Sequence, residues 1–134
     1  MQLKIITLIT LVSMLLSACT STGNLSLDGT SWELVSIGNQ RPIDGSTVTI
    51  SFENGQVRGN SGCNSYGGEY QLSGDKVEFG MLMSTMMACT DTAMMDQEST
   101  FIQLLGDAQR LEIVDGQLQI YRSDGEALMF VPIR

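Results

Sequence analysis

The segment VTISFENGQVRGN, residues 48–60, has the pattern of a β-hairpin. Val48, Ile50 and Phe52 alternate with polar residues, so one face of an extended strand is apolar. Asn54-Gly55 follows, and this pair is the strongest short hairpin signal because both residues tolerate the positive φ of a tight turn. The chain then returns through residues 56–60. The segment therefore indicates an antiparallel β fold.

Outward from this hairpin, short runs with the same period lie on both sides and are separated by turn residues. These runs are residues 31–37, 69–72, 76–79, 110–114, 117–121 and 127–132. Residues 92–105 differ, because their apolar residues have helical spacing, with Asp91 or Thr92 available as a cap and Gly106 just past the end. We predict a mainly β fold: a small antiparallel β-barrel-like domain of about eight strands, with one α-helix inserted between strands five and six.

The first residues have the features of an export signal. Lys4 supplies a positive charge, and residues 5–16 are apolar but shorter than the ~20 residues that cross a bilayer. Leu16-Ser17-Ala18-Cys19 resembles a bacterial lipobox, which implies a diacylglycerol on the Cys19 sulfur and cleavage after Ala18. Thr20, rather than Asp, follows Cys19, and by analogy with Gram-negative sorting this favours the outer membrane.

The chain is long enough for one domain after removal of the signal. We expect a lipoprotein signal peptide over residues 1–18, a Ser-, Thr- and Gly-containing tether over 19–27 and a single domain over 28–134. The lipid on Cys19 is the expected link to the membrane, with the domain facing the periplasm as a monomer.

Charge and composition exclude several functions. The chain carries a net charge of −8, which becomes about −9 without Lys4, and acidic surfaces repel phosphate backbones, so we expect no nucleic-acid partner. Histidine does not occur in the sequence. Ser-His-Asp triads, Cys-His pairs and imidazole zinc sites are therefore excluded. We expect no enzymatic activity, no cofactor and no metal.

Two cysteines remain once Cys19 is assigned to the lipid. In an oxidising compartment the even pair Cys63 and Cys89 reads as a disulfide, and closing a loop of about 27 residues contributes ~3.5 kcal/mol in the chain-entropy model. A reactive or metal-binding thiol pair is the alternative.

Methionine is abundant, with nine in the chain. Six lie within fifteen residues: Met81, Met83, Met86, Met87, Met94 and Met95. We expect these side chains to fill gaps in the core beside the cysteine pair; an adaptable binding patch and a thioether site for Cu(I) are the alternatives.

Tyrosines and acidic residues offer further candidates. Tyr66 and Tyr70, beside a glycine-rich loop, suggest either simple packing or a platform for a sugar or peptide. Asp91, Asp96 and Glu98 lack the spacing of a calcium loop and are expected on a solvated helix face. The possible binding residues are Tyr66, Tyr70, Met81, Met83 and Met86.

Two elements together resemble the META domain of HslJ-like envelope proteins: Gly59-x-x-Gly62-Cys63-Asn64-x-Tyr66-x-Gly68-x-Tyr70 and Thr85-x-Met87-Ala88-Cys89. The resemblance extends from Leu27 to Pro132. It implies a small, mostly antiparallel β-barrel-like fold with one helix, a Cys63–Cys89 pair and no established enzymatic activity. Family members are linked to heat-shock response, antibiotic tolerance, secretion or motility. Met86 departs from the family pattern, where a basic residue is frequent.

The sequence thus predicts an exported, lipid-anchored, non-enzymatic envelope-stress protein that binds a protein or peptide partner. The alternative is a carrier of a small molecule or Cu(I), which would use the barrel mouth or the methionine cluster. A hydrolase is the weakest hypothesis, because histidine is missing and no Gly-x-Ser-x-Gly motif is present.

Overall fold

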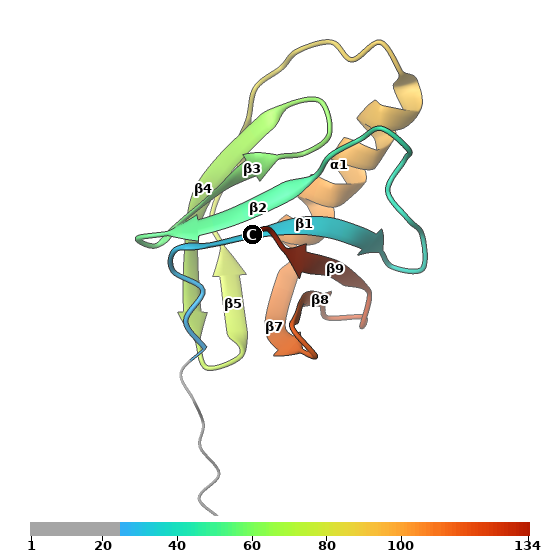
Figure 1. Cartoon of the computed structure of the whole chain (residues 1–134). Coiled ribbons are helices and arrows are strands. Elements are labelled where there is room, and N and C mark those ends of the chain that lie inside the picture. Colours follow the sequence, from blue (N-terminus) through green and yellow to red (C-terminus); the bar gives the residue numbers. More distant parts are fainter. Residues whose placement is uncertain (1–24) are drawn as a thin grey trace, which may run out of the picture.

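Nine strands and one helix make up the computed structural model, which describes residues 25–134 (Figure 1). In chain order they are β1 (Thr30–Ile37), β2 (Thr49–Glu53), β3 (Gln56–Asn60), β4 (Ser65–Ser73), β5 (Lys76–Phe79), β6 (Met83–Ser84), α1 (Thr92–Gly106), β7 (Ala108–Val114), β8 (Gln117–Arg122) and β9 (Ala127–Pro132). The signal segment and Cys19 lie outside the described residues. Within residues 25–134, no helix has both the length and the apolar character needed to cross a membrane.

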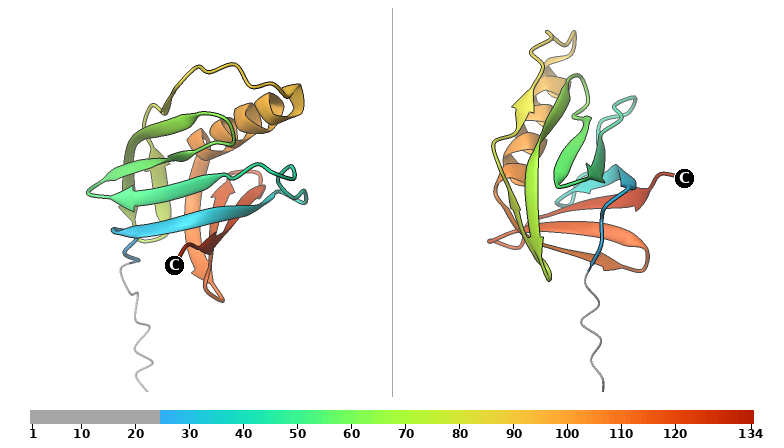
Figure 2. Two further views of the ribbon diagram at one scale, coloured as in Figure 1. Left: turned by 45° about the horizontal axis from the view of Figure 1, so that its top comes forward. Right: turned by 90° about the vertical axis from the view of Figure 1, so that its left-hand side faces the viewer.

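Eight of the strands close an antiparallel barrel. The hydrogen-bonded order β3-β2-β1-β9-β8-β7-β5-β4 is closed by pairing of β3 with β4, while β6 pairs with β4 on the edge opposite β3 (Figure 2). The pairing of β5 with β7 is the shortest in the barrel and has one register pair, Lys76 opposite Arg110. The prediction of an eight-stranded barrel with a helix after its fifth strand is confirmed; β6 is an additional short strand.

The interior of the barrel is filled by the alternating apolar residues of the strands. Ile50 and Phe52 of β2, Leu118 of β8 and Phe130 of β9 are buried almost completely. Each such side chain contributes about 1.5 to 3 kcal/mol when it leaves water. The period-two pattern read from the sequence is therefore the pattern of inward-facing residues.

Helix α1 lies across one end of the barrel (Figure 2). Asp91 caps its start, because the Asp91 side chain accepts a hydrogen bond from the Ala93 N–H at 2.9 Å. Its buried face carries Phe101, Leu104 and Leu105, and the Phe101 ring contacts Phe130 edge-on, with centroids 6.4 Å apart. The expectation that Gly106 lies just past the end of the helix is wrong by one residue. Gly106 is the last helical residue and Asp107 forms the C-cap.

Strand β4 begins at Ser65, four residues before the predicted start at Glu69. Its glycines are required because neighbouring chains approach closely: a Cβ on Gly68 would lie 2.8 Å from the Met81 carbonyl oxygen. A Cβ on Gly59, in β3, would lie 2.0 Å from the Thr49 carbonyl oxygen and 3.0 Å from the Tyr66 ring. Glycine here permits close contact between strands instead of ending the strand.

Two leucines that precede β1 also pack against the barrel. Leu27, assigned to the tether, is only 1% exposed, and Leu25 packs against the same core. These two leucines are apolar anchors at the start of the barrel.

Candidate functional site: a clamped methionine loop

Residues 80–91, which we call the methionine loop, connect β5 to α1 and run beside β4 in the same sheet. Through β6 they pair with β4, Ser84 opposite Tyr66 and Met83 opposite Gly67. The loop lies at the top of Figure 1, whereas the described chain enters the barrel at the bottom. The methionine loop and the N-terminal attachment are therefore at opposite ends of the molecule.

The methionine side chains point into solvent. Exposed fractions are 97% for Met86, 85% for Met81, 73% for Met83, 61% for Met87 and 44% for Met95. We call these five residues the methionine surface. The expectation that the cluster packs in the core is wrong, because leucine, isoleucine, valine and aromatic side chains already fill the barrel and the loop lies outside β4.

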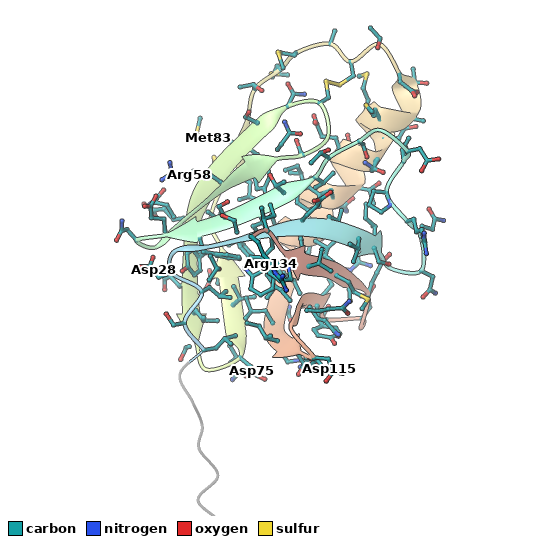
Figure 3. The ribbon with its side chains drawn as sticks, viewed as in Figure 1. Asp28, Arg58, Asp75, Met83, Asp115 and Arg134 are labelled. Carbon is teal, nitrogen blue, oxygen red and sulfur yellow. A yellow bond between two sulfur atoms is a disulfide. The ribbon has the colours of Figure 1, made fainter. Side chains whose placement is uncertain are left out.

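Met83 and Arg58 project from the same side of the barrel (Figure 3). Gly67 separates them, since it pairs with Arg58 of β3 on one side and with Met83 of β6 on the other. Arg58 is held by an ion pair of 2.9 Å with Glu53. One edge of the methionine surface is thus flanked by a cation that already has a carboxylate partner.

A disulfide holds the far end of the methionine loop. Cys63 and Cys89 are bonded, with Cα atoms 6.0 Å apart, in agreement with the pairing that the sequence predicts. Cys63 lies in the turn between β3 and β4, and Cys89 lies two residues before the helix cap. The bond therefore joins the loop to the barrel close to the start of α1.

Asn64 forms a second clamp beside the disulfide. This buried side chain accepts hydrogen bonds at Oδ1 from the Met87 N–H at 2.7 Å and from Thr85 Oγ1 at 3.0 Å. Its Nδ2 donates to Glu98 Oε1 at 2.6 Å and to the Met87 carbonyl oxygen at 3.4 Å. The backbone of Met87 is fixed in this way while its thioether remains exposed.

Glu98 of α1 accepts three further hydrogen bonds from this turn. Its Oε2 accepts from Ser61 Oγ at 2.8 Å, from the Asn64 N–H at 2.8 Å and from the Cys63 N–H at 3.2 Å. Desolvation raises the pKa of Glu98, but the hydrogen bonds from Asn64, Ser61 and Cys63 outweigh it, so the pKa is lowered from its usual 4.5.

The expectation that Glu98 lies on a solvated helix face is therefore wrong. A signal was available in the sequence, because Glu98, Phe101 and Leu105 are spaced three and four residues apart and so share one helix face. Phe101 and Leu105 are buried, which places the Glu98 carboxylate toward the barrel.

The two candidate tyrosines belong to the interior of the barrel. Tyr66 is buried, its hydroxyl donates to the Thr49 carbonyl oxygen at 2.9 Å, and its ring contacts Phe101 at 5.4 Å. Tyr70 is half-buried and packs edge-on against Phe52, with centroids 5.0 Å apart. Tyr66 is therefore a packing residue, whereas Tyr70 packs on one side and on the other lines an open hollow with Asp28 and Leu72.

Other candidate sites are weaker. Asp91 is used as the helix cap, and residues 25–134 contain no group of three or more acidic or cysteine side chains able to hold a metal ion. An open hollow of about 910 Å³ lies beside the β5–β7 seam. Its lining includes Lys76, Glu78, Asp107 and Arg122. The mixed charges there do not select one ligand class.

The comparisons with known proteins agree with this architecture. The model of the META domain matches residues 25–134. No curated protein sequence matches the chain. Among solved structures, one NMR structure of a protein from Burkholderia xenovorans is 27% identical, with a TM-score of 0.65, and the match covers 80% of this chain and 83% of that one.

Two further structures share the fold at lower identity. A second NMR structure is 22% identical, with a TM-score of 0.64 and coverage of 78% of this chain and 90% of that one. The crystal structure of a DUF4847 family protein from Bacteroides vulgatus is 14% identical, with a TM-score of 0.55 and coverage of 78% and 93%. With the family match spanning the whole barrel and its helix, this chain belongs to the META domain family.

Proposed function

We propose that this META domain protein is an exported, lipid-anchored, non-enzymatic binding protein of the bacterial envelope, and that the methionine surface receives a segment of a protein partner during envelope stress. The observation that carries the proposal is the exposure of five thioethers on a backbone fixed by a disulfide and by Asn64. Exposed methionines suit adaptable binding because the thioether is polarisable and the side chain flexible.

The clamp supports binding energetically. A mobile loop loses conformational freedom when it binds a partner, and this loss opposes association. The loop backbone is already ordered at Thr85, Met87 and Cys89. Binding therefore needs to order only the thioether side chains.

Charge supports a particular class of partner. No Lys or Arg occurs from Val77 to Gln109, and Asp91 and Asp96 lie close in sequence to the exposed methionines. The neighbouring cation, Arg58, is paired with Glu53. An apolar surface with acidic neighbours favours an amphipathic segment that carries apolar and basic side chains. The partner we propose is such a segment of an envelope protein.

The position of the loop supports a role away from the membrane. A lipid on Cys19 would be joined to Leu25 by six residues, which span at most about 20 Å. The methionine loop lies at the opposite end of the barrel from the start of the described chain (Figure 1). The tether would therefore hold the methionine surface facing the periplasm.

Site-specific crosslinking in intact cells tests the binding role. A photoreactive amino acid replaces Ala88, an exposed residue inside the methionine loop, and the matched control replaces Val114, an exposed residue of β7. We expect a discrete protein adduct from position 88 that is missing from position 114. Identical adducts from both positions, or none from position 88 under heat and antibiotic stress, would refute the docking site.

Lipid labelling tests the anchor separately. Cys19→Ser should abolish incorporation of labelled fatty acid and release the protein from the membrane fraction. Thr20→Asp should retain the label but move the protein to the inner membrane. Lipid labelling of Cys19→Ser, or the same outer-membrane location for Thr20→Asp, contradicts the anchoring and sorting assignments respectively.

A Cu(I) carrier is the second candidate, and one observation favours it. Met81 and Met83 are both exposed, while Leu82 between them packs against the core, so the two thioethers leave the chain as a pair. Thioethers are soft ligands that suit Cu(I). Titration with Cu(I) against a competing chelator decides this, since binding no tighter than micromolar, or equal binding by Met81→Leu/Met83→Leu, excludes the carrier.

A further inference from the structure

Sulfur in this domain is distributed unevenly between core and surface. Among the buried residues of the described chain there is no methionine; the core consists of leucine, isoleucine, valine, alanine and aromatic side chains. Five of the seven methionines in residues 25–134 are exposed, and Met94 and Met129 are partly exposed. The side chains most easily oxidised are therefore the ones that support the fold least.

The clamp contains no free thiol and uses no thioether sulfur. Cys63 and Cys89 are already joined as a disulfide, so neither is a free thiol. Met87 contributes its backbone N–H and carbonyl to Asn64, and its sulfur takes no part in these bonds. Glu98, Ser61 and Thr85 complete the clamp with oxygen atoms that two-electron oxidants leave unchanged.

We infer that the methionine surface is a reversible oxidation site for two-electron oxidants such as hypochlorous acid and hydrogen peroxide. Each thioether sulfur gives two electrons and gains one oxygen: hypochlorous acid yields sulfoxide, chloride and a proton, and peroxide yields sulfoxide and water. In the reverse step two thiols of a sulfoxide reductase supply two electrons and two protons, forming a disulfide and water. The oxidised and reduced proteins share one fold.

Oxidation changes the chemistry of the surface. A sulfoxide is polar and chiral, whereas the thioether is apolar and flexible, so conversion of Met81, Met83 and Met86 replaces an apolar patch by hydrogen-bond acceptors. The consequence for binding rests on the proposed docking function: conversion of the thioethers to sulfoxides releases the apolar side chains of the partner segment. Oxidant thereby changes partner binding at the methionine surface, while the core keeps its structure.

The oxidation claim is tested on the exported protein isolated with its disulfide intact. Hypochlorous acid is added in equivalents, sulfoxides are located by peptide mass spectrometry, and the melting temperature is measured at each step. We expect Met86, Met81 and Met83 to react at least about threefold faster than Met129, because rate follows exposure. The melting temperature should stay constant until those three are converted, and sulfoxide reductases of both stereospecificities should restore the original mass.

Two variants make the result specific. Met81→Leu/Met83→Leu/Met86→Leu keeps the apolar volume and should consume fewer equivalents of oxidant before the protein unfolds. Met129→Leu should consume as much oxidant as the native protein over the first equivalents added. Reaction at Met129 as fast as at Met86, or a melting temperature that falls with the first sulfoxide, overturns the oxidation site.

The link to docking is tested by the crosslink from position 88, measured before and after oxidation. Loss of the adduct on oxidation and its return after reduction supports the switch, whereas an adduct that survives full conversion of the methionine surface refutes it. Because the mass and melting data require no partner, failure of the docking proposal leaves the oxidation site standing on its own measurements.

Discussion

Asn64 is the residue on which the position of the methionine loop depends most. The four hydrogen bonds of its side chain join the turn after β3 to Thr85, to the backbone of Met87 and to Glu98 of α1. Replacement by alanine leaves buried groups on both sides without partners. Buried polar groups are costly when unpaired, and at this position a loop and a helix lose a shared partner at the same time.

We predict that Asn64→Ala lowers the free energy of unfolding by about 2 to 3 kcal/mol, because the Met87 N–H and the Glu98 carboxylate lose their partner. Guanidinium unfolding with the disulfide intact measures this. Ser65→Ala, at the exposed neighbouring position, is the matched control and should be within about 0.5 kcal/mol of the native protein. Equal stability of the two variants would show that Asn64 is not a clamp.

Glu98 gives the clamp a defined pH dependence. Because its pKa is lowered in the folded protein, its contribution to stability is fully present above its usual pKa of 4.5 and is lost as pH falls through the lower folded value. Glu98→Gln removes this titration. The stability difference between the native protein and Glu98→Gln should therefore be larger at neutral pH than in acid, and a difference that is constant with pH contradicts the assignment.

At the scale of elements, glycines set how closely β3 approaches β2 and how closely the methionine loop approaches β4. We predict that Gly59→Ala costs about 1 to 3 kcal/mol, since its Cβ meets the Thr49 carbonyl oxygen, which belongs to backbone and cannot move aside. Gly68→Ala should push the methionine loop away from β4. Gly106→Ala is the control: its Cβ meets nothing within 4 Å, and alanine in a helix is favoured by up to about 1 kcal/mol. Thermal unfolding separates the three variants.

The disulfide is the other element-scale constraint on the loop. Cys63→Ser/Cys89→Ser should lose roughly 3.5 kcal/mol if chain entropy alone applies, because the bond closes a long loop in the unfolded chain. Limited proteolysis should then cut the methionine loop first, since only Asn64 and the short β4–β6 pairing still hold it. If Cys63→Ser/Cys89→Ser is as stable and as protease-resistant as the native protein, the polar network around Asn64 holds the loop without the disulfide.

The strands, the helix and the cysteine pair follow from local patterns that the sequence displays directly. Ile50 and Phe52 alternate with polar residues and are buried; Phe101 and Leu105 have helical spacing and are buried. The methionine cluster is different, because an apolar side chain is buried only if the interior has room. Phe52, Phe101 and Phe130 come from three distant elements and fill that volume together, which no local window of sequence reveals.

At the scale of the whole molecule, the fold keeps three structural parts separate in space. The N-terminal leucines close one end of the barrel, α1 closes the other, and the methionine loop is held outside next to α1 (Figure 1). The buried side chains of the strands and of α1 form one hydrophobic core inside the barrel. The methionine loop lies outside that core with its thioethers exposed, which is why it is the site that we propose for a partner.

Met87 combines a fixed backbone with an exposed thioether, and NMR measures both properties in this one residue. Hydrogen exchange should show the Met87 amide protected by its bond to Asn64, while a soluble paramagnetic agent strongly broadens the Met87 methyl signal. An amide that exchanges at the rate of an unstructured loop, or a methyl group shielded from the agent, would contradict the clamped methionine surface.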